Sequence, residues 1–324
     1  MAFDVSVVVP TYNRAGVLPE TIDAVLAQTH PPVELIVVDD SSPDHTEQVV
    51  RGYGERVKYL KVPNGRAELA RNRGAAIARG NWLAFCDDDD LWKPDLLKRF
   101  AEVVGAAPDV RFLFCDFHIV RDGVWQPARK FDEAPAGYWD GDFTAVGPAR
   151  VYRDPMTPRT LRFQPVFMSC LAVRRDWFDE LGGFNPAFSG TGSADWEFVL
   201  RAVAAPPVAA VFEPLAGIRK HSGNMSGDLL FVKEGEVAIL RHALAHYPSV
   251  AVHRELIEEQ IVGRSIDATE LAFARGEFDR VRSNSRALPR HRAGFKLRLK
   301  RWVAGLPTPL AKAARRVLTG ARGG

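Results

Sequence analysis

The first hundred residues alternate between strand-like apolar runs and amphipathic segments. Four short runs rich in β-branched residues are typical of buried strands, and they occupy residues 5–10, 33–40, 57–63 and 82–86. Apolar residues at helical spacing predict a helix over 18–26. An Ala-rich stretch predicts another helix over 67–80, with Gly80 as its C-cap. This alternation predicts βαβ units and a largely parallel sheet covered on both faces.

The alternation breaks down from about Phe112. Residues 123–163 are rich in Pro, Gly and aromatic residues, and we expect them to form long loops. Further along the chain, residues 227–248 and 254–289 carry apolar residues at helical spacing and predict helices.

Polar side chains follow three of the predicted strands: residues 11–14, residues 39–42, and the four aspartates Asp87 to Asp90. Ligands of open α/β sheets bind beyond the carboxyl ends of the strands, so these groups are expected to share one crevice. Adjacent carboxylates repel one another, but a hard divalent cation offsets that repulsion. The alternative is an acidic turn that caps the next helix, which suits Asp90 and Asp95.

Composition narrows the class of protein. The chain has 324 residues, 46% hydrophobic and 26% charged, which are ordinary values for a globular protein with a core. Its three cysteines are far apart and form no CxxC pair, which disfavours a zinc site or a disulfide framework and indicates a reducing compartment. We expect no signal peptide before Val5, and no run of 18 apolar residues predicts a membrane span.

Charge is distributed unevenly along the chain. Residues 280–324 contain 13 Lys or Arg and no Asp or Glu, whereas residues 1–279 contain 30 basic and 40 acidic residues. A basic tail on an acidic body indicates an anionic partner, either a membrane or a nucleic acid.

Two short amphipathic segments lie in this basic tail. On helical spacing, the first has Phe295, Leu299, Trp302 and Val303 on one face, and the second has Leu310, Ala314, Val317 and Leu318. Cationic amphipathic helices of this kind lie on anionic membranes. The alternative is that both helices pack on the rest of the protein. No nucleic-acid-binding motif is present, and we expect no nucleic acid partner.

Four stretches, "SVVVPTYNR", "ELIVVDDSS", "ARNRGAAIARGNWLAFCDDDDLW" and "RKHSGNMS", together resemble family 2 glycosyltransferases from about Val5 to Ser226. The resemblance implies an α/β GT-A fold, a Rossmann-like, mostly parallel sheet with flanking helices, here followed by a C-terminal helical extension. It also implies inverting transfer from a nucleotide-diphosphate sugar. We expect a nucleotide-sugar-binding half at 1–112, an acceptor-binding half of the same domain at 113–227, and the basic helical extension at 228–324.

The resemblance assigns donor contacts by position. Residues 10–12 resemble a loop that packs on the base, Asp40 resembles an acceptor of a hydrogen bond from the base, and Arg219 resembles a phosphate contact. A turn-forming role is the alternative for Asp40, and a solvated helix face is the alternative for Arg71 and Asn72. The nucleotide-sugar-binding residues implied in this way are Pro10, Thr11, Tyr12, Arg14, Asp40, Arg71, Asn72, Asp87, Asp88 and Arg219.

The same resemblance implies a metal site. Asp87-Asp88-Asp89 corresponds to the family's Asp-X-Asp motif, and Asp89 is expected to coordinate Mg²⁺ or Mn²⁺ together with Asp87 and His221. The metal would stabilise the charge that grows on the leaving diphosphate. A structural histidine is the alternative for His221, and Asp90 is expected to be structural.

The segment 190–202 resembles the stretch that carries the catalytic base. Asp195 is the candidate general base, because inversion requires a group that takes the proton of the acceptor hydroxyl. Ala194 stands where the family usually has Glu, and this departure leaves the acceptor contacts open. The alternative for Asp195 is a cap on a helix that begins at Trp196. In the preceding loops, Tyr138, Trp139 and Phe143 are expected to be anchors rather than sugar-stacking residues.

The implied partners are a UDP, GDP or dTDP sugar and a saccharide or lipid-linked acceptor, in bacterial cell-envelope or exopolysaccharide synthesis. We expect a cytoplasmic protein, peripheral on the inner face of the cell membrane. One alternative is a sugar-phosphate nucleotidyltransferase, which would need a Gly-rich triphosphate loop that "PTYNRAG" lacks. The other is a non-catalytic protein that binds membrane or nucleic acid.

Overall fold

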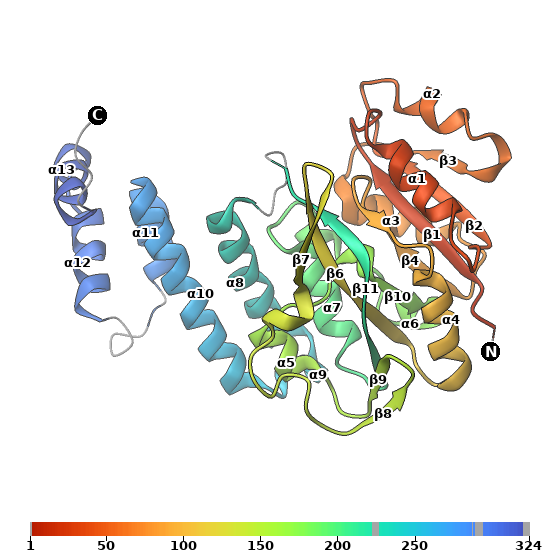
Figure 1. Ribbon diagram of the computed structural model, residues 1–324. Coiled ribbons are helices and arrows are strands. Elements are labelled where there is room, and N and C mark those ends of the chain that lie inside the picture. Colours follow the sequence, from red (N-terminus) through yellow and green to blue (C-terminus); the bar gives the residue numbers. More distant parts are fainter. Residues whose placement is uncertain (1, 222–226, 287, 289–293, 320–324) are drawn as a thin grey trace. The chain divides into compact units, whose positions relative to one another are not determined.

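The computed structural model describes residues 2–221, 227–286, 288 and 294–319. Two compact units make up the chain. The first comprises Met1–Gly190 with Ala194–Ser222, and the second comprises Thr191–Ser193 with Gly223–Gly324. Figure 1 shows a mixed α/β architecture in the first and helices in the second, which confirms the predicted fold class.

The α/β unit is built on one large sheet. The four predicted strands form as β1 (Val5–Thr11), β2 (Glu34–Asp39), β3 (Lys58–Lys61) and β4 (Trp82–Phe85). They are parallel, and the order along the sheet is β3-β2-β1-β4-β10-β6-β11-β9-β8. The central strands that follow are β6 (Phe112–Arg121), β10 (Leu171–Arg174) and β11 (Val208–Arg219).

Only β10 runs against its neighbours in the middle of this sheet. It pairs antiparallel with both β4 and β6, and β6 pairs parallel with β11. The carboxyl ends of β1, β2, β4, β6 and β11 therefore lie at one edge, which is where the sequence predicts the ligand crevice.

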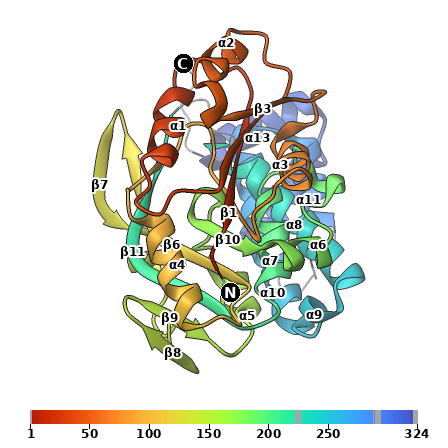
Figure 2. The ribbon, with the colours of Figure 1, turned by 90° about the vertical axis from the view of Figure 1, so that its right-hand side faces the viewer.

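Helices cover both faces of the sheet (Figure 2). On one face, α1 (Leu18–Leu26) and α4 (Leu96–Ala106) bury their apolar side chains against the sheet. On the other face, α3 (Arg66–Ala76), α6 (Arg175–Glu180) and α7 (Ala194–Ala202) do the same. The short helix α2 (Thr46–Arg51), between β2 and β3, was not predicted.

Helix α3 ends earlier than its sequence predicts. Its last residue is Ala76 and its C-cap is Ile77, so the prediction of a helix that reaches a cap at Gly80 is wrong. Gly80 instead lies against β1, and its N–H donates to the Ser6 hydroxyl at 2.9 Å. A Cβ at this position would lie 2.5 Å from the carbonyl oxygen of Asp4. The glycine is needed for close approach to a strand.

The segment 123–163 is not a set of long loops, and that prediction is wrong. It contains β7 (Val124–Arg129), β8 (Phe143–Val146), β9 (Ala149–Tyr152) and α5 (Thr157–Arg162). Its aromatic residues are anchors, as predicted for Tyr138 and Trp139. Tyr138 is buried, and the Trp139 ring lies 4.3 Å from that of Phe131, centroid to centroid. Phe143 packs on Tyr152 but stays partly exposed.

The second unit is helical, as its sequence predicts. Its described helices are α8 (Leu229–His246), α9 (Pro248–Ala251), α10 (Arg254–Arg275), α11 (Phe278–Arg286), α12 (Phe295–Ala304) and α13 (Thr308–Thr319). They share a small core that includes Leu230, Phe273, Val281 and Ala311. Across the described ranges, every helix falls short of the length and apolar character that a membrane crossing requires.

The apolar face predicted for α12 is divided in the structure. Val303 is buried together with Leu297, whereas Phe295 and Trp302 are 74% and 62% exposed. The predicted face contained Phe295, Leu299, Trp302 and Val303, but the residues of α12 that pack inward are Leu297, Val303 and Ala304, so only Val303 belongs to both sets. Two aromatic side chains are left in solvent.

Candidate active site

The four aspartates form a turn between β4 and the short strand β5 (Leu91–Trp92). Asp90 is buried, with one carboxylate oxygen accepting the Arg219 N–H at 2.9 Å and the other accepting the Ser169 hydroxyl. Burial raises the pKa of Asp90 well above its usual range, and the charges of Asp87 and Asp89 add to this rise. These contacts fix the turn, in agreement with a structural role for Asp90.

Asp89 and His221 come together from distant parts of the chain. Nε2 of His221, just after β11, lies 2.8 Å from Oδ2 of Asp89. A guanidinium nitrogen of Arg14, in the loop after β1, lies 3.8 Å from the same carboxylate oxygen. The Asp89 side chain is 11% exposed and that of His221 is 33% exposed, so His221 reaches the surface while Asp89 is largely buried beside it.

The donor atoms at this edge fit a divalent cation. Across the described residues no three potential ligands gather closely enough to form a metal site by themselves. Mg²⁺, however, is commonly held by one or two carboxylates together with substrate phosphates. Asp89 and His221 supply an oxygen and a nitrogen donor 2.8 Å apart, and Asp87 lies two residues away. The pair is therefore suited to a metal whose coordination a diphosphate completes.

Arg71 holds Asp87 from helix α3. Its guanidinium is buried on α3, donates to Asp87 and lies over the ring of Phe184 at 5.5 Å. Its Nε atom has no hydrogen-bond partner within the described residues. Besides Asp87, the carboxylates of Glu68 and Asp195 act on the charge of Arg71 and raise its pKa, against the effect of burial. Arg71 thus pairs with Asp87, and the charges of Glu68 and Asp195 also act on its guanidinium.

Asp195 lies in the first turn of α7, which begins at Ala194 rather than at Trp196. The alternative in which Asp195 caps a helix that begins at Trp196 is therefore not what the structure shows. Its Oδ1 accepts the Trp196 N–H at 2.9 Å. Burial raises the pKa of Asp195 to about 6, Asp87 and Glu68 add to the rise, and Arg71 opposes it. A carboxylate with this pKa is ionised at neutral pH yet is a stronger base than an ordinary Asp.

The loops after β1 and β2 adjoin the acidic turn. Asp88 accepts the backbone N–H of Tyr12 at 3.3 Å, and burial raises its pKa to about 7, with Asp89 and Asp87 adding to the rise. The Tyr12 side chain is 48% exposed. Pro10 and Thr11 are the last, buried residues of β1. The Asn13 N–H donates to the Ser42 hydroxyl at 2.9 Å, which ties the two loops together.

Three of the predicted donor contacts are engaged with the protein itself. Asp40 is buried and its two oxygens accept the N–H groups of Gly65 and Arg66, each at 2.8 Å. The Asn72 amide donates to the Phe184 carbonyl at 2.8 Å and accepts the Phe184 N–H at 2.9 Å. Arg219 pairs with Glu20 on α1. These contacts support a structural role for Asp40, Asn72 and Arg219 in addition to the predicted donor binding.

The comparisons with known proteins agree with this geometry. The model of the family described as glycosyl transferase family 2 matches residues 6–182, more than half of the chain. The chain belongs to this family. The tandem aspartates lie within the matched region.

Two relatives of this family 2 glycosyltransferase illustrate the similarity. It is 36% identical over 137 residues to TuaG of Bacillus subtilis, named for teichuronic acid biosynthesis, and the alignment covers 40% of this chain and 53% of the relative. It is 27% identical over 225 residues to an uncharacterized glycosyltransferase of Haemophilus influenzae, covering 68% and 70%. The chain thus spans about half the length of TuaG.

Solved structures show the same fold. TarS 1-349 of S. aureus superposes with a TM-score of 0.66 at 17% identity, covering 98% of this chain and 92% of that one. TarS has also been crystallised with UDP-GlcNAc. The mannosyltransferase PcManGT of Pyrobaculum calidifontis, in complex with GDP-Man and Mn²⁺, gives a TM-score of 0.57 at 18% identity, covering 98% and 88%. At these identities the likeness establishes the GT-A fold alone.

Several residues that hold the glycosyltransferase site together were missed by sequence reasoning. The buried Ser169 hydroxyl accepts the Asp87 N–H at 2.9 Å and donates to Asp90, so it fixes both ends of the acidic turn. Glu68 is buried beside Arg71. Ser169 and Glu68 belong to no recognisable sequence motif, and their partners come close to them only in the folded protein.

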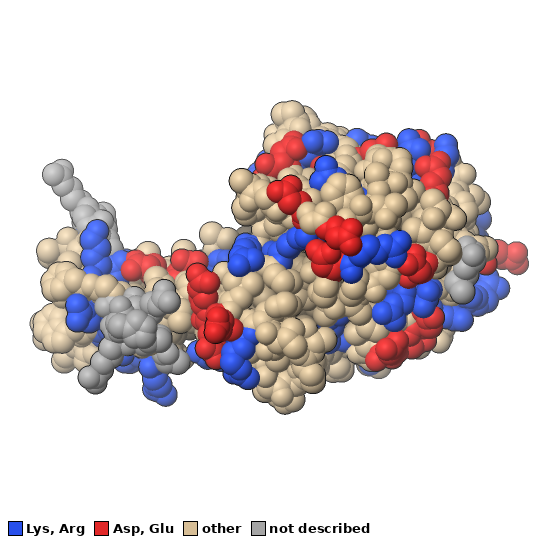
Figure 3. Space-filling view, turned by 90° about the horizontal axis from the view of Figure 1, so that it is seen from below, with Lys and Arg blue, Asp and Glu red and all other residues tan. Residues whose placement is uncertain are grey.

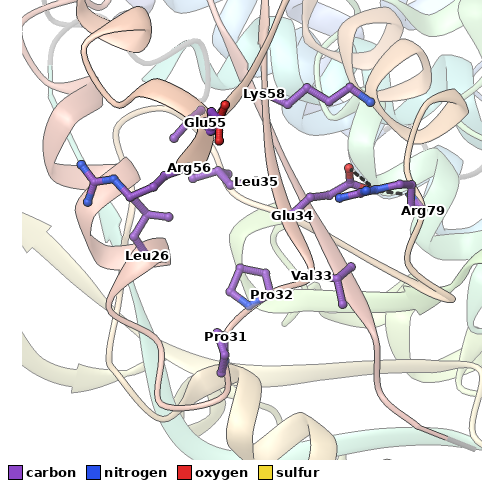
Figure 4. Close-up of a pocket in the computed structure, with 11 residues that line it drawn as sticks. Leu26, Pro31, Pro32, Val33, Glu34, Leu35, Glu55, Arg56, Lys58 and Arg79 are labelled. Carbon is purple, nitrogen blue, oxygen red and sulfur yellow. Dashed lines mark hydrogen bonds and ion pairs between the residues drawn. The ribbon is translucent and has the colours of Figure 1, made fainter.

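A cavity of about 660 Å³ lies elsewhere in the α/β unit, at the amino ends of β2 and β3 (Figure 4). Glu34 and Arg79 pair across part of its wall, with the guanidinium nitrogen and carboxylate oxygen 3.2 Å apart. None of the site residues described above lines it. It therefore lies at the opposite end of these strands from the candidate active site.

Proposed function

We propose that this glycosyltransferase depends on a divalent metal ion and transfers a sugar, with inversion, from a nucleotide-diphosphate sugar to a hydroxyl acceptor. The observation that carries this proposal is the Asp89–His221 pair, 2.8 Å apart at the carboxyl edge of the sheet and next to Asp87 and Asp88. The Mn²⁺ and GDP-Man bound to PcManGT, which shares the fold, support it.

The donor would bind across the ends of β1, β2 and β4. In this proposal the base packs on the loop of Pro10, Thr11 and Tyr12, and the half-exposed Tyr12 ring suits such a contact. Asp40 accepts a hydrogen bond from the base through its remaining lone pairs. Arg14 is close enough to Asp89 to reach the diphosphate. Asp88 accepts the Tyr12 N–H and would contact the ribose.

Asp87, Asp89 and His221 would hold Mg²⁺ or Mn²⁺. When bound, the metal supplies positive charge that stabilises the diphosphate as it leaves. Arg71, paired with Asp87 and buried, holds that carboxylate in place and adds a fixed positive charge nearby. Asn72 and Arg219 belong to the same proposed donor site, Asn72 through the segment at Phe184 and Arg219 through the backbone N–H that it gives to Asp90.

Asp195 is the proposed general base. It takes the proton of the acceptor hydroxyl while the hydroxyl oxygen attacks the anomeric carbon from the side opposite the diphosphate. The bond from that carbon to the diphosphate oxygen breaks, and its electrons leave with the nucleoside diphosphate. One displacement of this kind inverts the configuration. The raised pKa of Asp195, about 6, suits proton transfer near neutral pH.

The proposed donor is a UDP, GDP or dTDP sugar, and the acceptor is a saccharide or a lipid-linked saccharide of the bacterial cell envelope or an exopolysaccharide. The similarity to TuaG supports the cell-envelope assignment, and the TarS complexes with UDP-GlcNAc and UDP support a uridine nucleotide. We further propose that the protein works in the cytoplasm at the inner face of the membrane, with its basic C-terminal helices against anionic lipid.

A thermal-shift panel tests the donor and the metal together. Each nucleotide sugar is added to the full chain with Mn²⁺ or with a chelator, because a ligand that binds only the folded state raises its melting temperature. We expect one nucleotide class to raise the melting temperature with Mn²⁺ and to have little effect with the chelator. A rise of equal size in both conditions would contradict metal dependence.

A further inference from the structure

Three arginines line one cavity in the helical unit. The cavity has a volume of about 490 Å³ and is bounded by Arg286, Arg298, Arg301 and Leu288. None of these arginines has an acidic partner within ion-pair distance among the described residues. Three guanidinium groups around one cavity repel one another, and an anion bound between them removes that repulsion. Guanidinium groups also match the geometry of phosphate oxygens, so the cavity is suited to a phosphate group.

Two exposed aromatic side chains lie on α12, the helix that carries Arg298 and Arg301. Phe295, Arg298 and Trp302 are spaced i, i+3 and i+7, so they share one face of the helix. Phe295 is 74% exposed and Trp302 is 62% exposed. Isolated exposed apolar residues are ordinary, but two aromatic rings on the same helix face as Arg298, which lines the cavity, form a combined apolar and cationic surface.

Helix α13 also exposes both apolar and basic side chains. Leu310, Val317 and Leu318 are exposed at spacing i, i+7 and i+8, while Ala311 is buried in the core of the unit. Lys312 and Arg316 are exposed on this helix and have no acidic partner among the described residues. Figure 3 shows basic (blue) side chains on the surface of this unit, together with uncharged ones (tan) and acidic ones (red).

The inward faces of both helices are already occupied. Leu297 packs with Leu288 and against Val262 and Ile266, and Val303 and Ala304 belong to the core of the helical unit. The exposed residues are therefore not a core that folding has yet to complete. An external partner must be apolar enough to cover the aromatic rings and anionic enough to pair with the arginines.

We propose that α12 and α13 bind an anionic lipid bilayer, with one phospholipid phosphate group held between Arg286, Arg298 and Arg301 and with Phe295 and Trp302 inserted beside it. The proposal rests on the membrane contact proposed above and specifies the residues and the lipid group. Charge complementarity favours this partner, since residues 280–324 contain 13 basic and no acidic residues. The exposed rings favour a bilayer over a nucleic acid, because a phosphate backbone offers no apolar phase to receive them.

Flotation of the full chain with lipid vesicles tests the proposal. The vesicles are phosphatidylcholine alone or phosphatidylcholine mixed with phosphatidylglycerol. The variants are R298Q/R301Q and F295A/W302A, and the control is R241Q/R254Q, which removes two exposed arginines from other helices of the same unit. Circular dichroism confirms that each variant is folded.

We expect the wild type and the control to float only with the vesicles that contain phosphatidylglycerol. R298Q/R301Q should bind them roughly 30-fold more weakly, at about fivefold for each arginine lost. F295A/W302A should also lose binding, although its charge is unchanged. Equal flotation of all four proteins would overturn the proposal.

Three further experiments distinguish the bilayer from three other ligands of this surface: free phosphate, nucleic acid and a second copy of the chain. Inorganic phosphate that displaces the protein from vesicles at millimolar concentration would identify a site for free phosphate and overturn the lipid assignment. Tight binding of a DNA duplex that F295A/W302A retains, without vesicle binding, would favour nucleic acid instead. A dimer that F295A/W302A dissociates, with no flotation of the wild type, would show that a second copy covers this face.

The active site is assayed in the same preparations. R298Q/R301Q should bind the nucleotide sugar with Mn²⁺ as tightly as the wild type does. Flotation without nucleotide binding would refute the proposed function and leave the lipid site standing, and nucleotide binding without flotation would do the reverse.

Discussion

Nε2 of His221 lies 2.8 Å from Oδ2 of Asp89, although 132 residues separate them in the chain. The contact depends on strand pairing. Asp89 follows β4 near the centre of the sheet, and His221 follows β11, which pairs with β5 directly after the acidic turn. The same pairing brings the Arg219 N–H to Asp90 at 2.9 Å. The end of β11 thus places His221 beside Asp89, and it also supports the turn that carries Asp89.

Asp89→Asn should abolish most of the transfer activity while the protein stays folded. An amide keeps the shape of the side chain but removes the negative charge that a divalent cation requires. We expect kcat to fall by roughly 100-fold or more, the size of effect seen when one stabilising group for a developing charge is removed. Product formation from the nucleotide sugar measures it. Asp122→Asn, on an exposed turn, is the matched control and should retain full activity.

The pH dependence of kcat/KM should report Asp195. Burial raises the pKa of this carboxyl from 3.8 to about 6, so the ionised base is lost as the pH falls through 6. Below that pH, kcat/KM should decline by about tenfold per unit. Asp195→Asn should remove transfer at every pH. An acid limb that stays near pH 4 in the wild type would show that Asp195 is not the base.

Arg71→Met provides an independent check on that assignment. The positive charge of Arg71 opposes the rise in the Asp195 pKa, so its removal should shift the acid limb of kcat/KM to higher pH. Lower activity without a shift of the limb would mean that Arg71 acts only by holding Asp87.

Asn72→Ala should lower the free energy of unfolding by about 1–3 kcal/mol, because it leaves the buried N–H and carbonyl of Phe184 without their partners. Asn64→Ala, at an exposed loop position, is the control. Denaturant unfolding measures both. If the donor KM rises sharply while the unfolding free energy is unchanged, Asn72 acts on the nucleotide rather than on the fold.

Gly80→Ala and Gly105→Ala should change stability in opposite directions. A Cβ on Gly80 would lie 2.5 Å from the Asp4 carbonyl oxygen and 2.6 Å from the Ser6 nitrogen, and displacing a strand backbone should cost about 1–3 kcal/mol. Gly105 lies in helix α4 with nothing within 4 Å of the added carbon, so alanine there should stabilise by about 0.5–1 kcal/mol. Thermal unfolding of the two variants distinguishes them.

Much of the first half of the fold follows from local pattern. The runs that became β1, β2 and β4 are buried at nearly every position, so their apolar character alone identifies them. Gly80 misled the prediction because a glycine that ends a helix and a glycine that approaches a strand look alike in sequence. The short strands of 123–163 were missed because the Pro and Gly residues of this segment are also typical of loops. The pairing of these strands with distant strands cannot be predicted from local sequence.

In the candidate site, too, some features could be predicted from local sequence and others depend on distant parts of the chain. The acidic cluster was visible in the sequence because four adjacent carboxylates need an explanation. Ser169, which fixes the turn, was not visible, because a single serine 79 residues from Asp90 carries no signal until β10 pairs with β4. Asp40 looked like a ligand group, but its two bonds to Gly65 and Arg66 depend on a loop conformation that sequence pattern does not specify.

The most direct test of the account is a crystal structure of the full chain with a nucleoside diphosphate and Mn²⁺, with the metal located by its anomalous scattering. We expect one peak in contact with Asp89, His221 and the diphosphate oxygens. A diphosphate bound with no peak there, and with Asp89 and His221 still paired only to each other, would contradict it.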